Sequence, residues 1–405
     1  MQLNFCTPVV ILGVHYGSLG IARSLGRLGV PVHGVHNDLR THALASRYFG
    51  RRHHWDFARA SPANSVEFLL DLRTKLSRDA VLIPTTDDTA QLLADHAAAL
   101  RNVYRFQDNP PALVRQLRRK WELFRLATRH GIPTPKSLLP RSAQEARQFA
   151  DQIGFPLLLK ASDGARFEAR AMRKMLIVRT ASELTENYSL MEDTADPNLM
   201  LQEYIPGGDD AVWMFNGYFN RHSECVAGFT GKKLRQQPIH TGATSLGVCL
   251  RNDAVQELTT VFMSTLGYQG IIDIGFRHDA RDGLYKLLDV NPRIGATFRL
   301  FVGADGTDVA RLLYLDLTGQ PLPTTALVEG RKWLDENRDL FSSRDLWREG
   351  SLNLAAWLRS LRGIRETVWI ASDDPVPAVR MVAELARRAM RKVWRPVARP
   401  FLDVR

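Results

Sequence analysis

The residues best suited to chemistry lie near position 290. Asp289, Asn291 and Arg293 alternate along the end of an apolar strand that is expected over residues 285–290. In an extended chain, side chains at i, i+2 and i+4 share one face, so a carboxylate, an amide oxygen and a guanidinium converge. Two oxygen ligands beside a fixed cation suit an Mg²⁺–nucleotide phosphate site. The alternative is a plain turn, because an Asn-Pro pair with a glycine after it is also turn chemistry.

A strand upstream favours the site over the turn. Asp273 lies in an apolar, β-branched run, 271–276, and the short segment 279–283 connects this run to the strand that ends in Asp289. The two strands are expected to form a hairpin. A carboxylate in such a run is costly to bury unless it is paired or bound to a metal. We therefore expect Asp273, Asp289 and Asn291 to hold one or two Mg²⁺; pairing of Asp273 with an arginine is the alternative.

Length and composition set the class of protein. A chain of 405 residues, 45% apolar and 24% charged, is long enough for two or three globular domains. Its few, scattered cysteines (Cys6, Cys225 and Cys249) indicate a reducing cytoplasm rather than a disulfide framework or a zinc site. No stretch approaches the roughly 18 apolar residues of a membrane span. The net charge of +11 suits an anionic ligand, but without a nucleic-acid-binding motif we expect no nucleic-acid partner.

The N-terminal hundred residues alternate between strand and helix patterns, which predicts a small doubly wound parallel sheet. The expected strands are 8–14, 31–36 and 80–86, and the expected helices are 16–30, 64–77 and 88–100. Gly13, Gly17 and Gly20 have the spacing G-x-x-x-G-x-x-G, which is typical of a packing turn; a nicotinamide site is the alternative. Asp87 follows the third strand, at the sheet edge where such folds bind ligands.

The middle of the chain carries basic residues in apolar surroundings. A basic helix is expected over 113–131, followed by a proline-stiffened linker. Lys160 ends a short apolar strand, where a lysine needs an anion. Residues 199–210 are expected to be a strand, a Pro-Gly turn and two acids. Residues 211–249 are expected to be antiparallel strands around a basic loop, 231–238.

Beyond Pro323 the pattern changes to helices rich in Arg and Trp. The last of them, 381–399, has an apolar stripe opposite a basic face. It is interpreted as a helix that packs on the body of the protein, and the alternative is an interfacial helix on an anionic membrane. Apolar surface on the N-terminal domain would allow a homodimer.

Taken together, these motifs resemble the ATP-grasp superfamily. Lys120, Lys160, the Q-E-Y-I-P-G turn that begins at Gln202 and the D…D-V-N-P-R hairpin follow one another in its order and at its separations. The chain is most similar to the predicted bacterial carboxylate–amine ligases of that superfamily, which include D-aspartate-ligase-like proteins. The resemblance implies an α/β and α+β fold with a Rossmann-like pre-ATP-grasp domain (1–105), a two-lobed ATP-grasp domain (106–325) and a basic helical C-terminal extension (326–405).

The resemblance also implies roles for single residues. The nucleotide set is Lys120 and Lys160 for the α- and β-phosphates of ATP, the hinge Gln202, Glu203, Tyr204 and Ile205 for adenine, and Asp210 (or Asp209) for the ribose. The metal set is Asp273, Asp289 and Asn291, for Mg²⁺ or for Mn²⁺ in its place. The catalytic set is Arg293 for the acyl-phosphate transition state, with Lys233 and Arg235 near the γ-phosphate and the carboxylate substrate.

Two segments depart from the superfamily pattern. The loop over the phosphates, 161–175, contains a single glycine, so Arg166 or Lys174 would take over from backbone N–H groups. The superfamily often has its first metal acid directly before the aromatic residue of the strand. That position is Gly275 here, and Asp273 lies two residues earlier on the same face.

The implied reaction is amide formation. A carboxylate would take the γ-phosphoryl group of ATP, and an amine would attack the acyl phosphate, which gives an amide, ADP and phosphate. The expected partners are small-molecule carboxylates and amines. The expected location is the cytoplasm, and peripheral contact at the inner face of the membrane through 381–399 is the alternative. Two alternatives stay open: a non-catalytic or weakly active nucleotide-binding protein at a membrane surface, and an ATP-grasp phosphotransferase.

Overall fold

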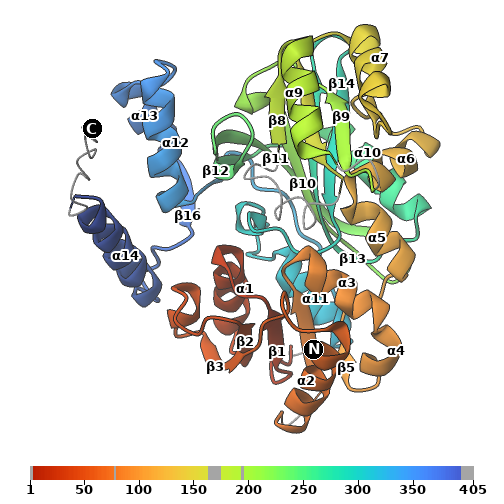
Figure 1. Ribbon diagram of the computed structural model, residues 1–405. Helices are drawn as coiled ribbons and strands as arrows, with labels where there is room; N and C mark the ends of the chain where they lie inside the picture. Colours follow the sequence, from red (N-terminus) through yellow and green to blue (C-terminus); the bar gives the residue numbers. More distant parts are fainter. Residues whose placement is uncertain (1–2, 77–78, 163–174, 193–195, 394–405) are drawn as a thin grey trace, which may run out of the picture.

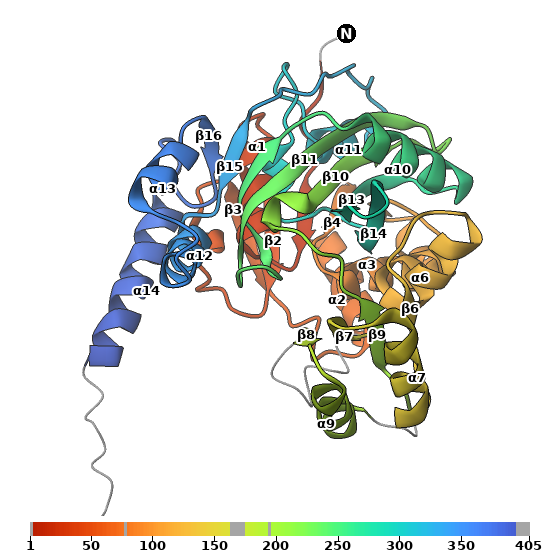
Figure 2. The same ribbon diagram turned by 90° about the horizontal axis from the view of Figure 1, so that it is seen from above.

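The computed structural model describes residues 3–76, 79–162, 175–192 and 196–393, which build three sheets. In Figure 1 a parallel sheet lies at the bottom, a four-stranded sheet at the upper right and the C-terminal helices on the left, around a central seven-stranded sheet; Figure 2 shows the same arrangement from above. Most of the predicted phosphate loop, with Arg166 and Lys174, lies outside the described residues.

The N-terminal domain is a parallel sheet in the order β3-β2-β1-β4-β5, as its alternating pattern predicted. Its elements are β1 (Val9–Leu12), α1 (Tyr16–Gly26), β2 (Val32–His36), β3 (Phe49–His54), α2 (Pro62–Thr74), β4 (Ala80–Pro84), α3 (Asp87–Asp95), α4 (Ala97–Leu100) and β5 (Tyr104–Arg105). The central strands β1 and β4 are continuous apolar runs because helices cover both faces. The edge strand β3 was not predicted, because its sequence FGRRHH is polar and largely exposed.

The following segment forms a small lobe. The predicted helix 113–131 is divided at Arg119, whose backbone is extended, into α5 (Pro111–Arg118) and α6 (Lys120–Arg129). The lobe itself is an antiparallel sheet in the order β6-β9-β7-β8 with two helices packed on it. Its elements are β6 (Ser137–Leu138), α7 (Ala143–Ile153), β7 (Leu157–Ala161), β8 (Met175–Val178), α9 (Ala181–Met191) and β9 (Leu199–Glu203).

The large sheet has the order β14-β13-β10-β11-β12-β15-β16. Its elements and those packed around it are η2 (Asp209–Ala211), β10 (Val212–Phe219), β11 (Cys225–Gln237), β12 (Ala243–Cys249), α10 (Asp253–Thr265), β13 (Gly270–Asp279), β14 (Leu284–Asn291), η3 (Phe298–Leu300) and α11 (Val309–Leu317). The predicted basic loop at 231–238 is wrong, because nearly all of it belongs to β11. Pairing with β12 along most of its length, and with β10 at Gly231 and Lys232, overrides its low strand propensity.

The two faces of the large sheet pack into different cores. Phe215 and Ile274 point to one face and pack with α5, α6 and α10. Met214, Tyr218 and Phe229 point to the other face and pack with α11 and the N-terminal domain. The β13–β14 hairpin therefore lies where the large sheet meets the parallel sheet.

The C-terminal segment joins both other parts of the protein. It is helical as predicted, with α12 (Glu336–Arg348), α13 (Leu354–Ser360) and α14 (Val376–Val393), and it adds two unpredicted strands, β15 (Lys332–Leu334) and β16 (Ile364–Thr367). Since β15 pairs with β12, the large sheet runs across the predicted boundary at 325. Arg23 of α1 forms a buried ion pair of 2.9 Å with Asp374. No helix in the described parts of the chain has the length and apolarity needed to cross a bilayer.

Candidate nucleotide and metal site

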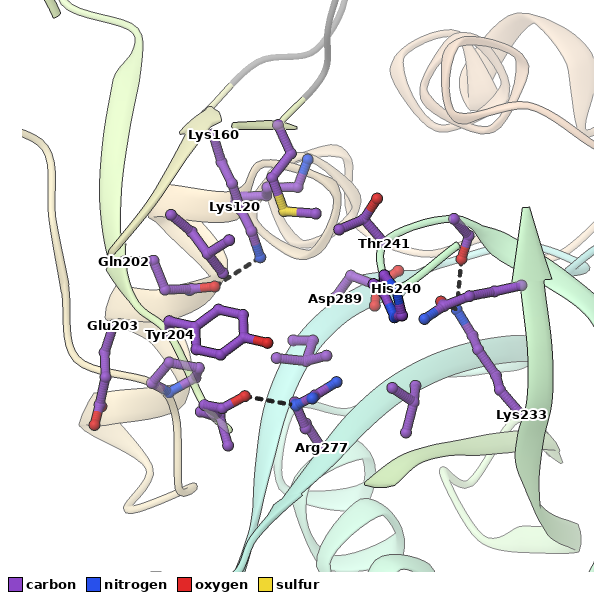
Figure 3. Close-up of a pocket in the computed structure, with 18 of the residues that line it drawn as sticks. Lys120, Lys160, Gln202, Glu203, Tyr204, Lys233, His240, Thr241, Arg277 and Asp289 are labelled. Carbon is purple, nitrogen blue, oxygen red and sulfur yellow. Dashed lines mark hydrogen bonds between the residues drawn. The ribbon is translucent and has the colours of Figure 1, made fainter. Parts of the chain in front are cut away.

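A cavity of about 380 Å³ lies between the four-stranded lobe and the large sheet, in the size range of small-molecule sites (Figure 3). Its walls come from α6, β7, β9, β11, β13, β14 and the 238–242 connection. It brings together predicted residues from segments far apart in the sequence: Lys120, Lys160, Gln202, Glu203, Tyr204, Ile205, Lys233 and Asp289.

Lys160 is a buried cation in the wall that the small lobe contributes. It is 9% exposed, and its Nζ donates a hydrogen bond of 2.7 Å to Oε1 of Gln202. The amide nitrogen of Gln202 donates in turn to Ser137, which fixes the orientation of the amide. Burial, and then the charge of Lys120, lower the pKa of Lys160 to about 8. An anion beside Nζ would favour the charged form, so this wall suits an anionic group such as a phosphate.

Two other lysines face the same cavity. Lys120 begins α6, and its backbone N–H donates to the carbonyl of Ser162 at 3.2 Å. Lys233 on β11 donates from Nζ to the carbonyl of Gly242 at 2.9 Å. Burial lowers the pKa of Lys233, and nearby carboxylates, Asp289 foremost, act in the opposite direction. The excess of positive charge suits a polyanion.

The hinge after β9 is held by an arginine that the sequence analysis missed. Arg277 on β13 donates from Nε to the carbonyl of Ile205 at 2.9 Å and from Nη2 to the carbonyl of Gly207. Its guanidinium lies in the cavity close to the ring of Tyr204 (Figure 3). The sequence feature that could have identified Arg277 is its position directly after Phe276, the aromatic residue of β13, on the same strand face as Asp273.

Glu203 and Asp210, the acidic residues predicted to contact adenine and ribose, have surroundings that differ from the predicted ones. The carboxylate of Glu203 accepts a hydrogen bond of 2.6 Å from Arg281 and one from a backbone N–H of the proline linker. Its side chain thus fixes the linker and the β13–β14 turn. Asp210 is exposed and is absent from the described lining of the cavity. Its neighbour Asp209 accepts a 2.8 Å hydrogen bond from Gln236, which does line the cavity.

The hairpin brings Asp273, Asp289 and Asn291 together. Nδ2 of Asn291 lies 3.1 Å from Oδ2 of Asp273 and 3.5 Å from Oδ2 of Asp289. Burial, and then the charge of Asp289, raise the pKa of Asp273 to about 6. A divalent cation would relieve this repulsion, and carboxylate and amide oxygens are the donors that Mg²⁺ takes. Within the described residues no three His, Cys, Asp or Glu side chains cluster, so the third ligand of this set is the amide.

Two glycines leave room for the carboxylates. A Cβ on Gly275 would clash with Oδ1 of Asp289, and a Cβ on Gly295 would clash with the carboxylate of Asp273. This explains the departure from the superfamily pattern at Gly275. The carboxylate of Asp289 fills the space that an acidic side chain at position 275 would need.

Arg293 lies behind the metal set rather than in the described lining of the cavity. Its Nη2 donates to Oδ1 of Asn291 at 3.1 Å, and its Nε forms an ion pair of 2.7 Å with Asp87. Asp87, the acid predicted at the edge of the N-terminal sheet, and Arg293 are therefore ion-pair partners. Through this pair the N-terminal domain orients the amide of Asn291.

Arg235 is absent from the described lining of the cavity, which argues against its predicted role near the γ-phosphate. It forms a buried, bidentate ion pair with Asp339 of α12, at 2.7 and 2.9 Å. In a regular strand Arg235 would share a face with Lys233. The register of β11 against β12 shifts between Lys233 and Arg235 and again before Gln236, and these bulges turn Arg235 to the other side.

Comparison with known proteins agrees with this geometry. Residues 117–212, which contain Lys120, Lys160 and the hinge, match the RimK-like ATP-grasp domain. The chain carries an ATP-grasp domain. The resemblance seen in the sequence is therefore confirmed at the level of the superfamily.

Relatives and solved structures extend the likeness beyond that domain. D-aspartate ligase of Enterococcus faecium is 24% identical over 251 residues, and the match covers 59% of this chain and 59% of that protein. Two solved structures share the ATP-grasp fold. Biotin carboxylase of Campylobacter jejuni, in its β-γ-ATP complex, has a TM-score of 0.63 at 16% identity, covering 80% of this chain and 74% of that one. L-amino acid ligase of Bacillus licheniformis has a TM-score of 0.58 at 14% identity, covering 81% and 76%.

Proposed function

We propose that this chain is an ATP-dependent carboxylate–amine ligase that uses ATP and Mg²⁺, with Mn²⁺ as a substitute. A carboxylate receives the γ-phosphoryl group, an amine displaces phosphate from the acyl phosphate, and ADP is left. The observation that carries the proposal is one cavity lined by the buried Lys160 of the small lobe, by Lys120 at the start of α6 and by Asp289 of the large sheet. That arrangement suits a metal–nucleotide polyphosphate between the lobes.

In this proposal the nucleotide lies along the cavity. Lys120 and Lys160 bind the phosphates, the backbone at Tyr204 and Ile205 binds adenine, and Asp209 is better placed for the ribose than Asp210. Bound Mg²⁺ neutralises phosphate charge as a Lewis acid. Arg277 keeps the hinge carbonyls in place.

The remaining residues serve the acyl-transfer end of the site. Asp273, Asp289 and Asn291 hold the metal, and Arg293 keeps the Asn291 amide oriented. Lys233 lies on β11 with its Nζ turned to the 238–242 connection, and we assign it to the γ-phosphate and the carboxylate substrate. No side-chain nucleophile is needed, because the transferred group passes directly from ATP to the carboxylate.

The relatives support the reaction class. D-aspartate ligase and L-amino acid ligase are both named for joining amino acids, which are carboxylates and amines. This chain spans 59% of the length of the D-aspartate ligase, so its own acid and amine form part of the proposal. A phosphotransferase draws no support from these relatives.

Cytoplasmic location, a homodimer and peripheral membrane contact through 381–399 stay predictions of the sequence. The described part of that segment is the end of α14, where Val382 and Met390 are exposed beside exposed arginines. Sedimentation with anionic vesicles, with and without this segment, tests the membrane contact.

The decisive assay measures Mg²⁺-dependent release of ADP and phosphate from ATP with pooled carboxylates and amines. Asp289→Asn removes a proposed metal ligand, and Asp253→Asn, an exposed carboxylate on α10, is the matched control. We expect phosphate release that needs both an acid and an amine, is kept in the control and is lost in Asp289→Asn. ADP formation with an acceptor but without phosphate release would indicate a phosphotransferase. Failure to bind ATP would refute the proposal.

A further inference from the structure

One buried amide beside the metal set has no evident role in the fold. Asn216 on β10 is fully buried, and neither its Nδ2 nor its Oδ1 has a hydrogen-bond partner among the described residues. Buried polar groups are normally hydrogen-bonded, because an unpartnered amide loses its water without compensation. A protein gains nothing in stability from such a group, which points to a functional role for it.

The strand pairing identifies the one neighbour on the sheet able to use this amide. Asn216 pairs with Asp273 of β13 on one side and with Phe229 of β11 on the other, and cross-strand partners point to the same face. Along β10 its same-face neighbours are Met214 and Tyr218. The Tyr218 hydroxyl already donates to Asp316 at 2.5 Å. Asp273 is therefore the one carboxylate among these neighbours that could accept from the Asn216 amide.

Asp273 is held from its other side as well. It pairs in register with Asn291 of β14, so Asn216, Asp273 and Asn291 form a row across three adjacent strands. At present Nδ2 of Asn291 donates to Asp273, while Oδ1 of Asn291 accepts from Arg293. Nδ2 of Asn291 faces both carboxylates, so a cation between them can take the Asn291 amide oxygen only if the amide turns, and Nδ2 then no longer donates to Asp273.

We propose that Asn216 is a positioning residue for the metal set, whose amide N–H holds the Asp273 carboxylate when the cation is bound. Asn216 touches neither the metal nor a substrate and acts through Asp273. The inference rests on the proposed Mg²⁺–nucleotide site and adds to it a residue that no motif selects. Partners behind metal ligands commonly affect affinity, and their loss weakens metal binding about 10- to 100-fold.

The test compares metal binding with stability. Asn216→Leu removes the amide and leaves a side chain of similar size, and we expect Mn²⁺ to bind the protein–ADP complex about tenfold more weakly, as measured by electron paramagnetic resonance. The unfolding temperature of the ligand-free variant should be unchanged or higher, because an unpartnered polar group has been removed. Asn216→Ser keeps a hydrogen-bond donor and should retain part of the Mn²⁺ affinity. Asn216→Ala is measured as well, in case leucine at this position prevents folding.

Thr259→Val is the matched control. The Thr259 hydroxyl on α10 is also buried, and it too has no partner in the described structure, but it lies on the helix side away from the metal set. Its removal should leave Mn²⁺ affinity unchanged. Two results would overturn this inference: Mn²⁺ affinity at the wild-type level in both Asn216→Leu and Asn216→Ala, or an equal loss of Mn²⁺ affinity in Thr259→Val. Neither result would affect the proposed function. Absence of Mn²⁺–ADP binding in the wild type would overturn both.

Discussion

Raising the pH from 7 to 9 should weaken ADP binding through loss of the Lys160 charge. In the ligand-free protein, burial and the charge of Lys120 lower the pKa of Lys160 to about 8. A phosphate beside Nζ favours the protonated amine, so binding above this pKa must take up a proton. Affinity should therefore fall as the pH rises through the pKa of the free protein.

The magnitude follows from the protonated fraction. With a pKa of about 8, roughly nine-tenths of the Lys160 side chains are charged at pH 7 and roughly one-tenth at pH 9, so affinity drops about tenfold, or about 1.4 kcal/mol. The same lowered pKa makes the free energy of unfolding depend on pH in the opposite direction to the ADP affinity. The folded-state pKa lies below the ordinary value of 10.5, so unfolding takes up a proton between pH 8 and pH 10.5. The contribution of Lys160 to the free energy of unfolding therefore rises with pH over that window.

Isothermal titration calorimetry with Mg²⁺ and ADP at pH 7, 8 and 9 measures this effect. In two buffers of different ionisation enthalpy, the same titrations count the protons taken up. Lys160→Arg is the control, because arginine stays charged over this range and Lys233, whose pKa is also lowered, is retained. A wild-type affinity that changes less than twofold, or an equal pH dependence in Lys160→Arg, would refute the reasoning.

Three further predictions concern single side chains. Arg277→Met removes the hydrogen bonds that hold the hinge carbonyls, and the KM for ATP should rise about tenfold in steady-state kinetics. Arg235→Met leaves the Asp339 carboxylate buried and unpaired; urea unfolding should show a loss of about 3–5 kcal/mol, with activity per folded molecule retained. Gly275→Ala sets a methyl group against Asp289, and Mg²⁺ affinity should fall at least about tenfold in the binding titration. An unchanged KM, unfolding midpoint or Mg²⁺ affinity, respectively, would contradict them.

The parts of the site that could be predicted depend on local geometry. Asp273, Asp289 and Asn291 belong to one hairpin, and alternation along paired strands places them on one face whatever surrounds it. Lys160 stood out because a lysine in an apolar strand requires an anion. The parallel sheet followed from the βα rhythm, except for β3, whose polar sequence gives no strand signal at an exposed edge.

Other features could not be predicted because they depend on long-range partners. Glu203 is the last residue of β9, next to the hinge, yet its carboxylate pairs with Arg281, 78 positions later. Arg235 meets Asp339, 104 positions later, after bulges that no local pattern announces. The strands β15 and β16 are short, and they exist because the edge of β12 was available to pair with.

The sequence by itself determined which charged groups this protein has in apolar strands and, through strand alternation, which of them share a face. Tertiary structure alone decided which of those groups meet the cavity and which are neutralised in the body of the protein. Arg277 reaches the hinge, Asn216 lies buried beside Asp273, and Arg293 finds Asp87, 206 positions earlier. Local periodicity acts over a few residues, whereas sheet register, bulges and ion pairs join segments that only the folded chain brings together.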